Sequence, residues 1–361
     1  MSMNGAISDR LEALRSFDQT KKGVKGLVDA GITNIPPIFV HEAAEKADLV
    51  NDEVAIPTIN LEAIHTSEGR KAIVEEVARA CREIGFFLVV NHGIPLDVME
   101  RIIGSVKAFH ELPGEDKSKF YTRSGKEKGV SYLSNVDLYK SKAASWRDTI
   151  QVGLDPSWPH LENIPEICRN EVVEWDEHSS RLAKLLLELL SEGLGLDSNR
   201  LTELKCTEQK TMAGHYYPWC PQPELTVGLS PHTDPGLLTM VAQDHVGGLQ
   251  VKCGEKWVEI KPIPGALVIN IGDIMQMMSN DAYLSGLHKV VTNHSKEPRV
   301  SVAVFFNPIV RETLLGPFPE LTSAEKPPNY RQFTVNEYYT VFFNRELGDK
   351  SLKEHFKLIA D

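Results

Sequence analysis

The chain has 361 residues, a net charge of −11 and an apolar share of 42%. The length and apolar share are ordinary for a globular protein with a sizeable core. The negative charge argues against nucleic acid or an anionic membrane surface as a partner. No secretory signal is visible at the N-terminus, and we expect no membrane-spanning helix. The five cysteines are scattered without a Cys-x-x-Cys pair, which predicts free thiols in a reducing cytoplasm.

The first 200 residues or so combine helical patterns with short apolar strands. Residues 1–50 read as an N-terminal arm, helical over 8–20. Apolar residues recur at helical intervals over 68–83, 96–111 and 170–194, and strands are predicted at 55–61, 86–90 and 146–153. The segment 121–142 is rich in Gly, Ser, Lys and Tyr without a clear period. It is predicted to be an irregular loop, either one that borders a binding site or a plain surface loop.

From Lys210 onward the pattern becomes all-β. Short apolar runs recur at intervals of about ten residues with turn residues between them, which is typical of a sandwich or barrel. After Pro308 the chain returns to loop and to a helix over 335–345, whose apolar face is expected to cover the barrel. We expect one integrated unit in three parts: an α-rich region with a few strands at 1–209, a β core at 210–310, and a C-terminal loop with the covering helix at 311–361.

A histidine and a carboxylate lie two residues apart at His232 and Asp234, between flanks that read as strand. Residues i and i+2 of a strand share a face, so both side chains can reach one ion. A second histidine, His288, lies in another apolar stretch. Two imidazoles and one carboxylate form the triad that suits non-haem Fe(II) and leaves positions open for substrates and oxygen. Because a His-x-Asp pair alone is a weak signal, the assignment needs a second one.

Arg299 and Ser301 supply that second signal. They open a strongly apolar run that ends at Phe306, typical of a buried strand, and they share one face of it. An arginine inside such a run is costly unless it meets an anion, and its planar fork suits a carboxylate. A metal triad followed by an inward Arg-x-Ser is more specific than either part alone.

In combination, these residues resemble the plant 2-oxoglutarate/Fe(II)-dependent dioxygenases. The resemblance runs from about Thr20 to Phe343. The opening stretch 21–29 points to the subgroup of aminocyclopropane-carboxylate oxidase homologues, which includes hydroxylases of plant specialised metabolism. Four further stretches are similar to family signatures: Gly85-Phe-Phe-Leu-Val-Val-Asn-His-Gly-Ile-Pro95, Trp146-Arg147-Asp148, His215-Tyr-Tyr-Pro-Trp-Cys-Pro-Gln-Pro223 and Gly247-Gly-Leu-Gln-Val251.

The resemblance implies a double-stranded β-helix (jelly-roll) core with flanking α-helices, a mixed α and β fold. It also implies an oxidoreductase that uses Fe(II), 2-oxoglutarate and O2 to oxidise, and most simply to hydroxylate, a plant specialised metabolite. Succinate and CO2 would be released, and ascorbate would serve as reductant. The implied metal ligands are His232, Asp234 and His288, and the implied 2-oxoglutarate contacts are Arg299, Ser301 and Tyr217.

The substrate pocket is the part that the sequence defines least. Phe305 is implied as a pocket ring, with a place in the core as the alternative. Asn307 and Tyr132 are further candidates, and the alternative for Tyr132 is a place in a plain surface loop. His215 stands where the family usually has Asn, so its role is open between support of the ligands, cosubstrate contact and packing. Gly286 and Leu287 also depart from the family pattern beside His288, which we interpret as a change of substrate rather than a loss of metal.

Other functions are compatible with the same residues. An ascorbate-dependent oxidase resembling aminocyclopropane-carboxylate oxidase shares them, as does an O-demethylase or desaturase, and a non-catalytic small-molecule binding protein would keep a degenerate site. The chain length and N-terminal extension favour the 2-oxoglutarate enzyme over the ascorbate-dependent one, and the intact residues argue against the binding protein. We expect a small-molecule substrate, no nucleic-acid or membrane partner and a cytoplasmic location; a monomer is compatible with the sequence, which leaves the oligomeric state open.

Overall fold

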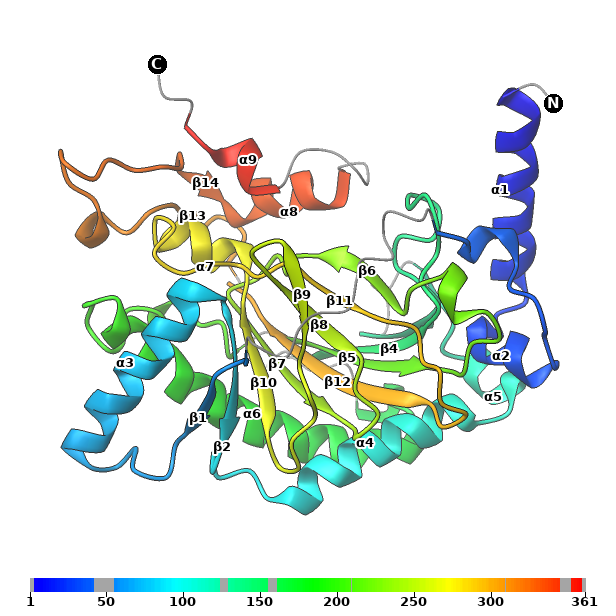
Figure 1. Cartoon of the computed structure of the whole chain (residues 1–361), viewed down its shortest axis with the longest axis horizontal. Coiled ribbons are helices and arrows are strands. Elements are labelled where there is room, and N and C mark those ends of the chain that lie inside the picture. Colours follow the sequence, from blue (N-terminus) through cyan, green and yellow to red (C-terminus); the bar gives the residue numbers. More distant parts are fainter. Residues whose placement is uncertain are drawn as a thin grey trace.

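The structure, a computed structural model, describes residues 3–41, 55–123, 129–154, 161–208, 210–308, 310–344 and 352–358. An eight-stranded and a four-stranded sheet pack face to face, with helices on the outer side of the larger sheet (Figure 1). One apolar cluster joins their inner faces, with Leu88 and Val268 from the larger sheet and Val251 and Val290 from the smaller. The predicted double-stranded β-helix with flanking helices is thereby confirmed.

The two sheets interleave strands from distant parts of the chain. The larger sheet has the order β1-β2-β10-β7-β12-β5-β4-β3 and the smaller β6-β11-β8-β9. The larger sheet consists of β1 (Thr58–Asn60), β2 (Phe86–Val90), β10 (Leu267–Ile271), β7 (Leu238–Gln243), β12 (Arg299–Phe306), β5 (Lys210–Tyr217), β4 (Asp148–Leu154) and β3 (Val130–Leu133). The smaller sheet consists of β6 (Leu229–His232), β11 (His288–Val290), β8 (Leu249–Cys253) and β9 (Lys256–Glu259), and β13 (Leu314–Leu315) pairs with β14 (Phe333–Thr334).

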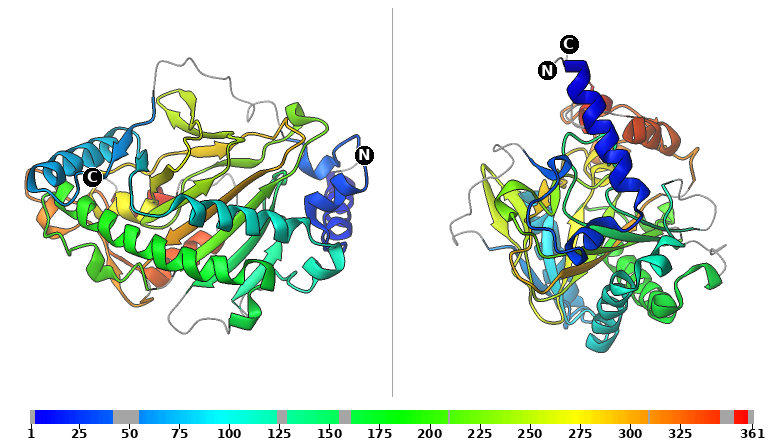
Figure 2. Two further views of the ribbon diagram at one scale, coloured as in Figure 1. Left: turned by 90° about the horizontal axis from the view of Figure 1, so that it is seen from below. Right: turned by 90° about the vertical axis from the view of Figure 1, so that its right-hand side faces the viewer.

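Helices α4 and α6 run side by side across the outer face of the larger sheet (Figure 2). The central strands are therefore covered on both faces, which explains why all five residues of β10 are buried rather than every second one. The described helices are α1 (Met3–Gln19), α2 (Gly23–Asp29), α3 (Ser67–Glu83), α4 (Leu96–Glu111), α5 (Gly114–Ser118), α6 (Glu166–Gly193), α7 (Asp273–Met278), α8 (Val335–Asn344) and α9 (Leu352–Phe356).

Alternation along the strands decides which side chains face the smaller sheet. In β12, Arg299 and Ser301 share the inner face, whereas Val300 belongs to the core beneath α4 and α6. The register of β5 places Tyr217 directly opposite Arg299 and His215 directly opposite Ser301. The polar residues of these two strands therefore gather on one inner face of the barrel.

The long helices agree with the sequence patterns, and the shorter elements do not all do so. The helices predicted over 68–83, 96–111, 170–194 and 335–345 are confirmed as α3, α4, α6 and α8, although Arg345 lies outside the described residues. The segment predicted as irregular contains β3, a short strand without alternation that is held by its pairing with β4; its residues 124–128 are not described.

The predicted division into three parts stays a prediction, and Gln209, at the first boundary, lies outside the described residues. What the strand order adds is that β1 to β4, all from the first part, belong to the same sheet as β5, β7, β10 and β12.

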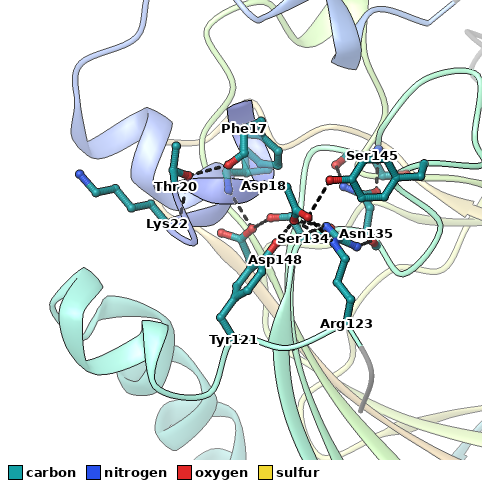
Figure 3. A network of polar contacts seen from close by, with 12 residues as sticks. Phe17, Asp18, Thr20, Lys22, Tyr121, Arg123, Ser134, Asn135, Ser145 and Asp148 are labelled. Atoms are coloured by element: carbon teal, nitrogen blue, oxygen red, sulfur yellow. Dashed lines mark hydrogen bonds and ion pairs between the residues drawn. The ribbon is translucent and has the colours of Figure 1, made fainter. Parts of the chain in front are cut away.

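Two aspartates fasten the N-terminal arm to this sheet (Figure 3). Asp148, the first residue of β4, is buried and accepts hydrogen bonds from the backbone N–H groups of Val24 and Lys25, both at 2.8 Å, and from the Ser134 hydroxyl. A Cβ added at Gly23 would lie 2.4 Å from the Asp148 carboxylate, so this approach requires glycine. Asp148 thereby holds the start of α2 against the sheet.

Asp18, near the end of α1, receives hydrogen bonds from three side chains. The guanidinium of Arg123 donates to it at 2.6 to 2.8 Å, and the Tyr121 hydroxyl donates as well (Figure 3). The Tyr139 hydroxyl donates a further hydrogen bond at 2.8 Å. Burial alone would raise the pKa of Asp18, but the hydrogen bonds from Arg123, Tyr121 and Tyr139 outweigh it and hold the pKa below its usual value. Arg123 also donates to the carbonyls of residues 134 and 135, so Asp18 ties α1 to the chain next to β3.

The replacement Asp18→Asn should lower the melting temperature at pH 7 by about 1–3 °C, because it removes the charge that these donors share. Since the folded-state pKa is depressed, the stabilisation is present above the ordinary carboxyl pKa and is lost as the pH falls through the folded-state value. Thermal unfolding of both proteins at pH 7, 5, 4 and 3.5 should therefore show a gap that narrows below about pH 4. Asp29→Asn, in an exposed pair with Lys25, is the matched control; a gap independent of pH would contradict the prediction.

Candidate metal and cosubstrate site

Strands β6 and β11 bring two histidines together. His232, the last residue of β6, lies directly opposite His288, the first residue of β11, with ring centroids 4.2 Å apart. Asp234 follows in the loop that leads to β7, and its Oδ1 lies 3.6 Å from Nε2 of His232 and 3.7 Å from Nε2 of His288. One potential ligand atom from each residue thus lies within 4.8 Å of the others.

The carboxylate of Asp234 is oriented by two side chains of the larger sheet. Thr239 donates its hydroxyl to Oδ2 at 2.6 Å, and Asn270 donates its amide to the same oxygen at 2.7 Å. Burial would raise the pKa of Asp234, but the two facing imidazoles and the hydrogen bonds outweigh it and hold the pKa well below its usual range. The carboxylate is therefore ionised, with Oδ1 directed at the imidazoles.

Both imidazoles present Nε2 because Nδ1 already has a partner. Nδ1 of His232 lies 2.9 Å from the Ser230 carbonyl and Nδ1 of His288 lies 3.0 Å from the Gly286 carbonyl, so each Nδ1 carries the proton and donates it. Burial, with the neighbouring His232, lowers the pKa of His288 to about 4. At neutral pH His288 is uncharged, and its Nε2 lone pair is free to bind a cation.

This donor set fits the cation that the sequence predicts. Two imidazole nitrogens and one carboxylate oxygen converge from one side, which is the facial arrangement suited to non-haem Fe(II). The backbone carbonyls that fix the histidines and the side chains that fix Asp234 are the supports that metal ligands usually have.

Arg299 lies buried on the inner face of β12, where its guanidinium forms hydrogen bonds to neutral side chains. Its guanidinium donates to Ser301 Oγ and to Gln243 Oε1, both at 3.0 Å, and lies 4.9 Å from the ring centre of Tyr217. Its Nε is buried without a hydrogen-bond partner, and it forms no ion pair in the described part of the chain. A buried guanidinium in this state is costly, so the geometry suits a ligand carboxylate. The sequence-predicted group Arg299, Ser301 and Tyr217 is thus brought together.

His215 lies between this group and the neighbouring strand β4. It is directly opposite Ser301 on one side and Thr149 on the other, and its Nδ1 is 3.0 Å from Thr149 Oγ1. Burial, together with the positive charges of Arg147 and Arg299, holds its pKa well below the usual value. His215 is therefore a neutral hydrogen-bonding group on the inner face and adds no charge to it.

Two of the three predicted substrate contacts lie near Asp234, one opposite its support Thr239 and one against the loop of residues 233–237 that carries it. Phe305 is partly exposed and lies directly opposite Thr239, the residue that donates to Asp234. The Oδ1 of Asn307 is buried without a partner in the described ranges, and a Cβ added at Gly236 would lie 2.1 Å from it. Both residues are therefore next to the candidate ligands.

The structure places Tyr132 elsewhere. It pairs with Ile150 on the outer face of the larger sheet, is fully buried, and packs edge-on against the rings of Phe109 and His110. Its hydroxyl donates to the Lys22 carbonyl at 3.2 Å. The sheet separates Tyr132 from the candidate ligands, so we do not include it among the proposed substrate contacts.

Sequence reasoning missed the side chains that orient these groups. Thr239 and Asn270 hold Asp234, Gln243 contacts Arg299, and Thr149 contacts His215. All four lie on the face that turns toward the barrel interior, and Thr239, Gln243 and Asn270 are polar residues in mostly apolar strands. A buried polar side chain needs a partner, so such a polar interruption was a signal that could have found these three. Thr149 gives no such signal, because β4 also contains Asp148 and Gln151.

Two family models match separate parts of the chain. Residues 56–171 match the non-haem dioxygenase in morphine synthesis N-terminal family, and residues 208–308 match the 2OG-Fe(II) oxygenase superfamily. The second match includes the metal candidates and the Arg299 group.

Relatives cover nearly the whole chain. The 1-aminocyclopropane-1-carboxylate oxidase homolog 1 of Arabidopsis thaliana is 46% identical over 342 residues, 92% of this chain and 92% of the relative. Deacetoxyvindoline 4-hydroxylase of Catharanthus roseus is 41% identical over 363 aligned residues, 97% of this chain and 90% of the relative. The crystal structure of JOX2 in complex with 2OG, Fe and JA is similar with a TM-score of 0.82 at 31% identity, covering 93% of this chain and 98% of that chain. The chain therefore belongs to the 2OG-Fe(II) oxygenase superfamily, among the plant dioxygenases that include the 1-aminocyclopropane-1-carboxylate oxidase homologues.

Proposed function

We propose that this Fe(II)- and 2-oxoglutarate-dependent dioxygenase hydroxylates a small plant specialised metabolite with O2, releasing succinate and CO2. One observation carries the proposal: the converging His232, Asp234 and His288 lie in the same barrel as Arg299, a buried guanidinium without an ion-pair partner in the described ranges. A relative named as a hydroxylase, deacetoxyvindoline 4-hydroxylase, supports the choice of hydroxylation.

The strand register suggests a separate role for each group of residues. His232, Asp234 and His288 would hold Fe(II), which when bound supplies the activation of O2. Arg299, with Ser301 and Tyr217, would bind the distal carboxylate of 2-oxoglutarate. Thr239, which donates to the candidate ligand Asp234, lies opposite Phe305 and not opposite Arg299. The substrate, which must approach the metal, would therefore contact Phe305 and Asn307 rather than the arginine.

Further aspects of the function are proposals of the same kind. We propose ascorbate as the reductant that keeps the iron ferrous, and a monomer as the working form. All five cysteines are free, which supports a reducing compartment such as the cytoplasm. No helix in the described part of the chain is long and apolar enough to cross a bilayer.

The first test is succinate release by Fe(II)-loaded protein with 2-oxoglutarate, ascorbate and a panel of plant alkaloids, phenolics and benzoxazinoids. Succinate should rise with one compound class and fall to background in His232→Ala, which removes one of three ligands. His294→Ala, at an exposed histidine outside the ligand set, is the matched control and should keep the activity. Oxidised product without succinate would indicate the ascorbate-dependent oxidase, and undiminished iron binding by His232→Ala would contradict the metal assignment.

The second test is directed at the cosubstrate. Arg299→Lys keeps a positive charge but loses the fork that contacts Ser301 and Gln243. The dissociation constant for 2-oxoglutarate, measured by titration calorimetry with Mn(II) in the metal site, should rise about 10- to 100-fold. Mn(II) affinity itself should stay unchanged. The exposed Arg311→Lys serves as control, and an unchanged 2-oxoglutarate affinity in Arg299→Lys would refute the assignment.

A further inference from the structure

The short helix α9 near the C-terminus brings a lysine to the supports of the metal site. Lys353 lies 3.2 Å from Asp273 Oδ1 and donates to Gln276 Oε1 at 2.8 Å. Both partners belong to α7, against which α9 packs, and the Phe356 ring of α9 contacts the Tyr338 ring of α8 (Figure 1). Asp273 is almost fully buried and the Lys353 side chain is only 15% exposed, so this ion pair is largely removed from water.

The acidic partner of Lys353 touches the loop between the first two candidate ligands. The hydroxyl of Thr233, which stands between His232 and Asp234, donates to Asp273 Oδ2 at 3.0 Å. The backbone N–H of Asp273 donates to the carbonyl of Asp234 at 2.7 Å. One carboxylate oxygen of Asp273 therefore faces Lys353 while the other fixes the loop that carries two metal candidates.

The amide partner of Lys353 touches the segment that carries the third candidate. Gln276 Oε1 accepts a hydrogen bond from the backbone N–H of Ser285 at 2.8 Å as well as the one from Lys353. Ser285 directly precedes Gly286, whose carbonyl accepts the Nδ1 proton of His288. Lys353 is thus linked through Asp273 to the loop that carries His232 and Asp234. It is linked through Gln276 to the segment that leads to His288.

The packing around these contacts leaves little room for α7 to shift alone. A Cβ added at Gly272, just before α7, would lie 2.2 Å from the carbonyl oxygen of Gly236 in the metal-bearing loop. From α8, Tyr338 donates its hydroxyl to the carbonyl of Pro235 in the same loop at 2.7 Å. A displacement of α7 would therefore be transmitted to the loop rather than absorbed between them.

Removing the lysine would leave the buried carboxylate of Asp273 without its cation, which is strongly unfavourable. The carboxylate would then turn toward water, and the hydrogen bond from Thr233 would weaken. Because outer-shell contacts fix the orientation of metal ligands, their loss lowers metal affinity even when the ligands remain.

We propose that Lys353 is a positioning residue for the metal site, which holds the 232–234 loop through Asp273 and the His288 segment through Gln276. This inference rests on the proposed role of His232, Asp234 and His288 as metal ligands. It assigns a function to the C-terminal helix α9, which carries none of the candidate site residues.

The test is the affinity of the full-length chain for Co(II), followed by absorption titration, together with thermal unfolding of the metal-free protein. Lys353→Met, which keeps the length but not the charge, should lower Co(II) affinity about tenfold. Lys353→Arg, which can restore the ion pair, should recover most of that loss. Lys357→Met, at an exposed lysine whose side chain pairs with Glu354 at 3.5 Å, is the matched control and should bind Co(II) like the unaltered chain.

A second variant keeps the inference falsifiable if Lys353→Met does not fold. Thr233→Val breaks the link between Asp273 and the metal-bearing loop while it leaves the Lys353 ion pair intact, and it should also lower Co(II) affinity. In the double variant the two losses should add only in part, because both act through Asp273 while Lys353 also acts through Gln276. The inference would be overturned if Thr233→Val bound Co(II) with unchanged affinity. It would also be overturned if Lys353→Met folded and showed only a lower melting temperature, with unchanged Co(II) affinity. Failure of the unaltered chain to bind Co(II) would overturn the proposed metal site with it.

Discussion

The orientation of the Asp234 carboxylate is the constraint on which the rest of the site depends. Its Oδ2 is occupied by Thr239 and Asn270 from two strands of the larger sheet, so Oδ1 can only face the two imidazoles of the smaller sheet. The ionised group lies where the two sheets meet, and a buried anion there requires a cation. The same contacts between the two sheets therefore also support the proposed metal site.

The proposed cosubstrate contacts on the inner face of the larger sheet are also fixed by strand pairing. Strands β5 and β12 are paired over eight residues, and their register fixes Tyr217 against Arg299 and His215 against Ser301 without any adjustable loop. Side chains that alternate with these belong to the core beneath α4 and α6. If the pairing of β12 shifted by one residue, Arg299 would point into that core. The burial of Val300, Val302 and Val304 therefore fixes the position of the polar side chains that alternate with them.

The sequence predicted the long helices and the β core because their apolar periods extend over many residues. Strand parity singled out His232 with Asp234 and Arg299 with Ser301, whereas His288 was recognised from its apolar stretch and Tyr217 from the resemblance to the family. The sequence assigned Tyr132 to the substrate side, yet that position lies in β3, a strand whose face is set only by its pairing with β4. It also could not foresee partners remote in the chain. Asp18 with Arg123 and Lys353 with Asp273 are pairs of surface-type residues whose meeting depends on the finished fold.

The strand order of the larger sheet has a consequence for how the chain folds during synthesis. Of the four strands in the first 154 residues, β1 and β2 end up at one side of the sheet and β3 and β4 at the other, with β10, β7, β12 and β5 between them. The pair β1 and β2 and the pair β3 and β4 therefore cannot be joined into one sheet until β12, which ends at residue 306, has been synthesised. Such non-local pairing folds slowly and leaves strand edges exposed meanwhile. We expect the emerging N-terminal half to depend on chaperones, and fragments that end before β12 to aggregate rather than fold.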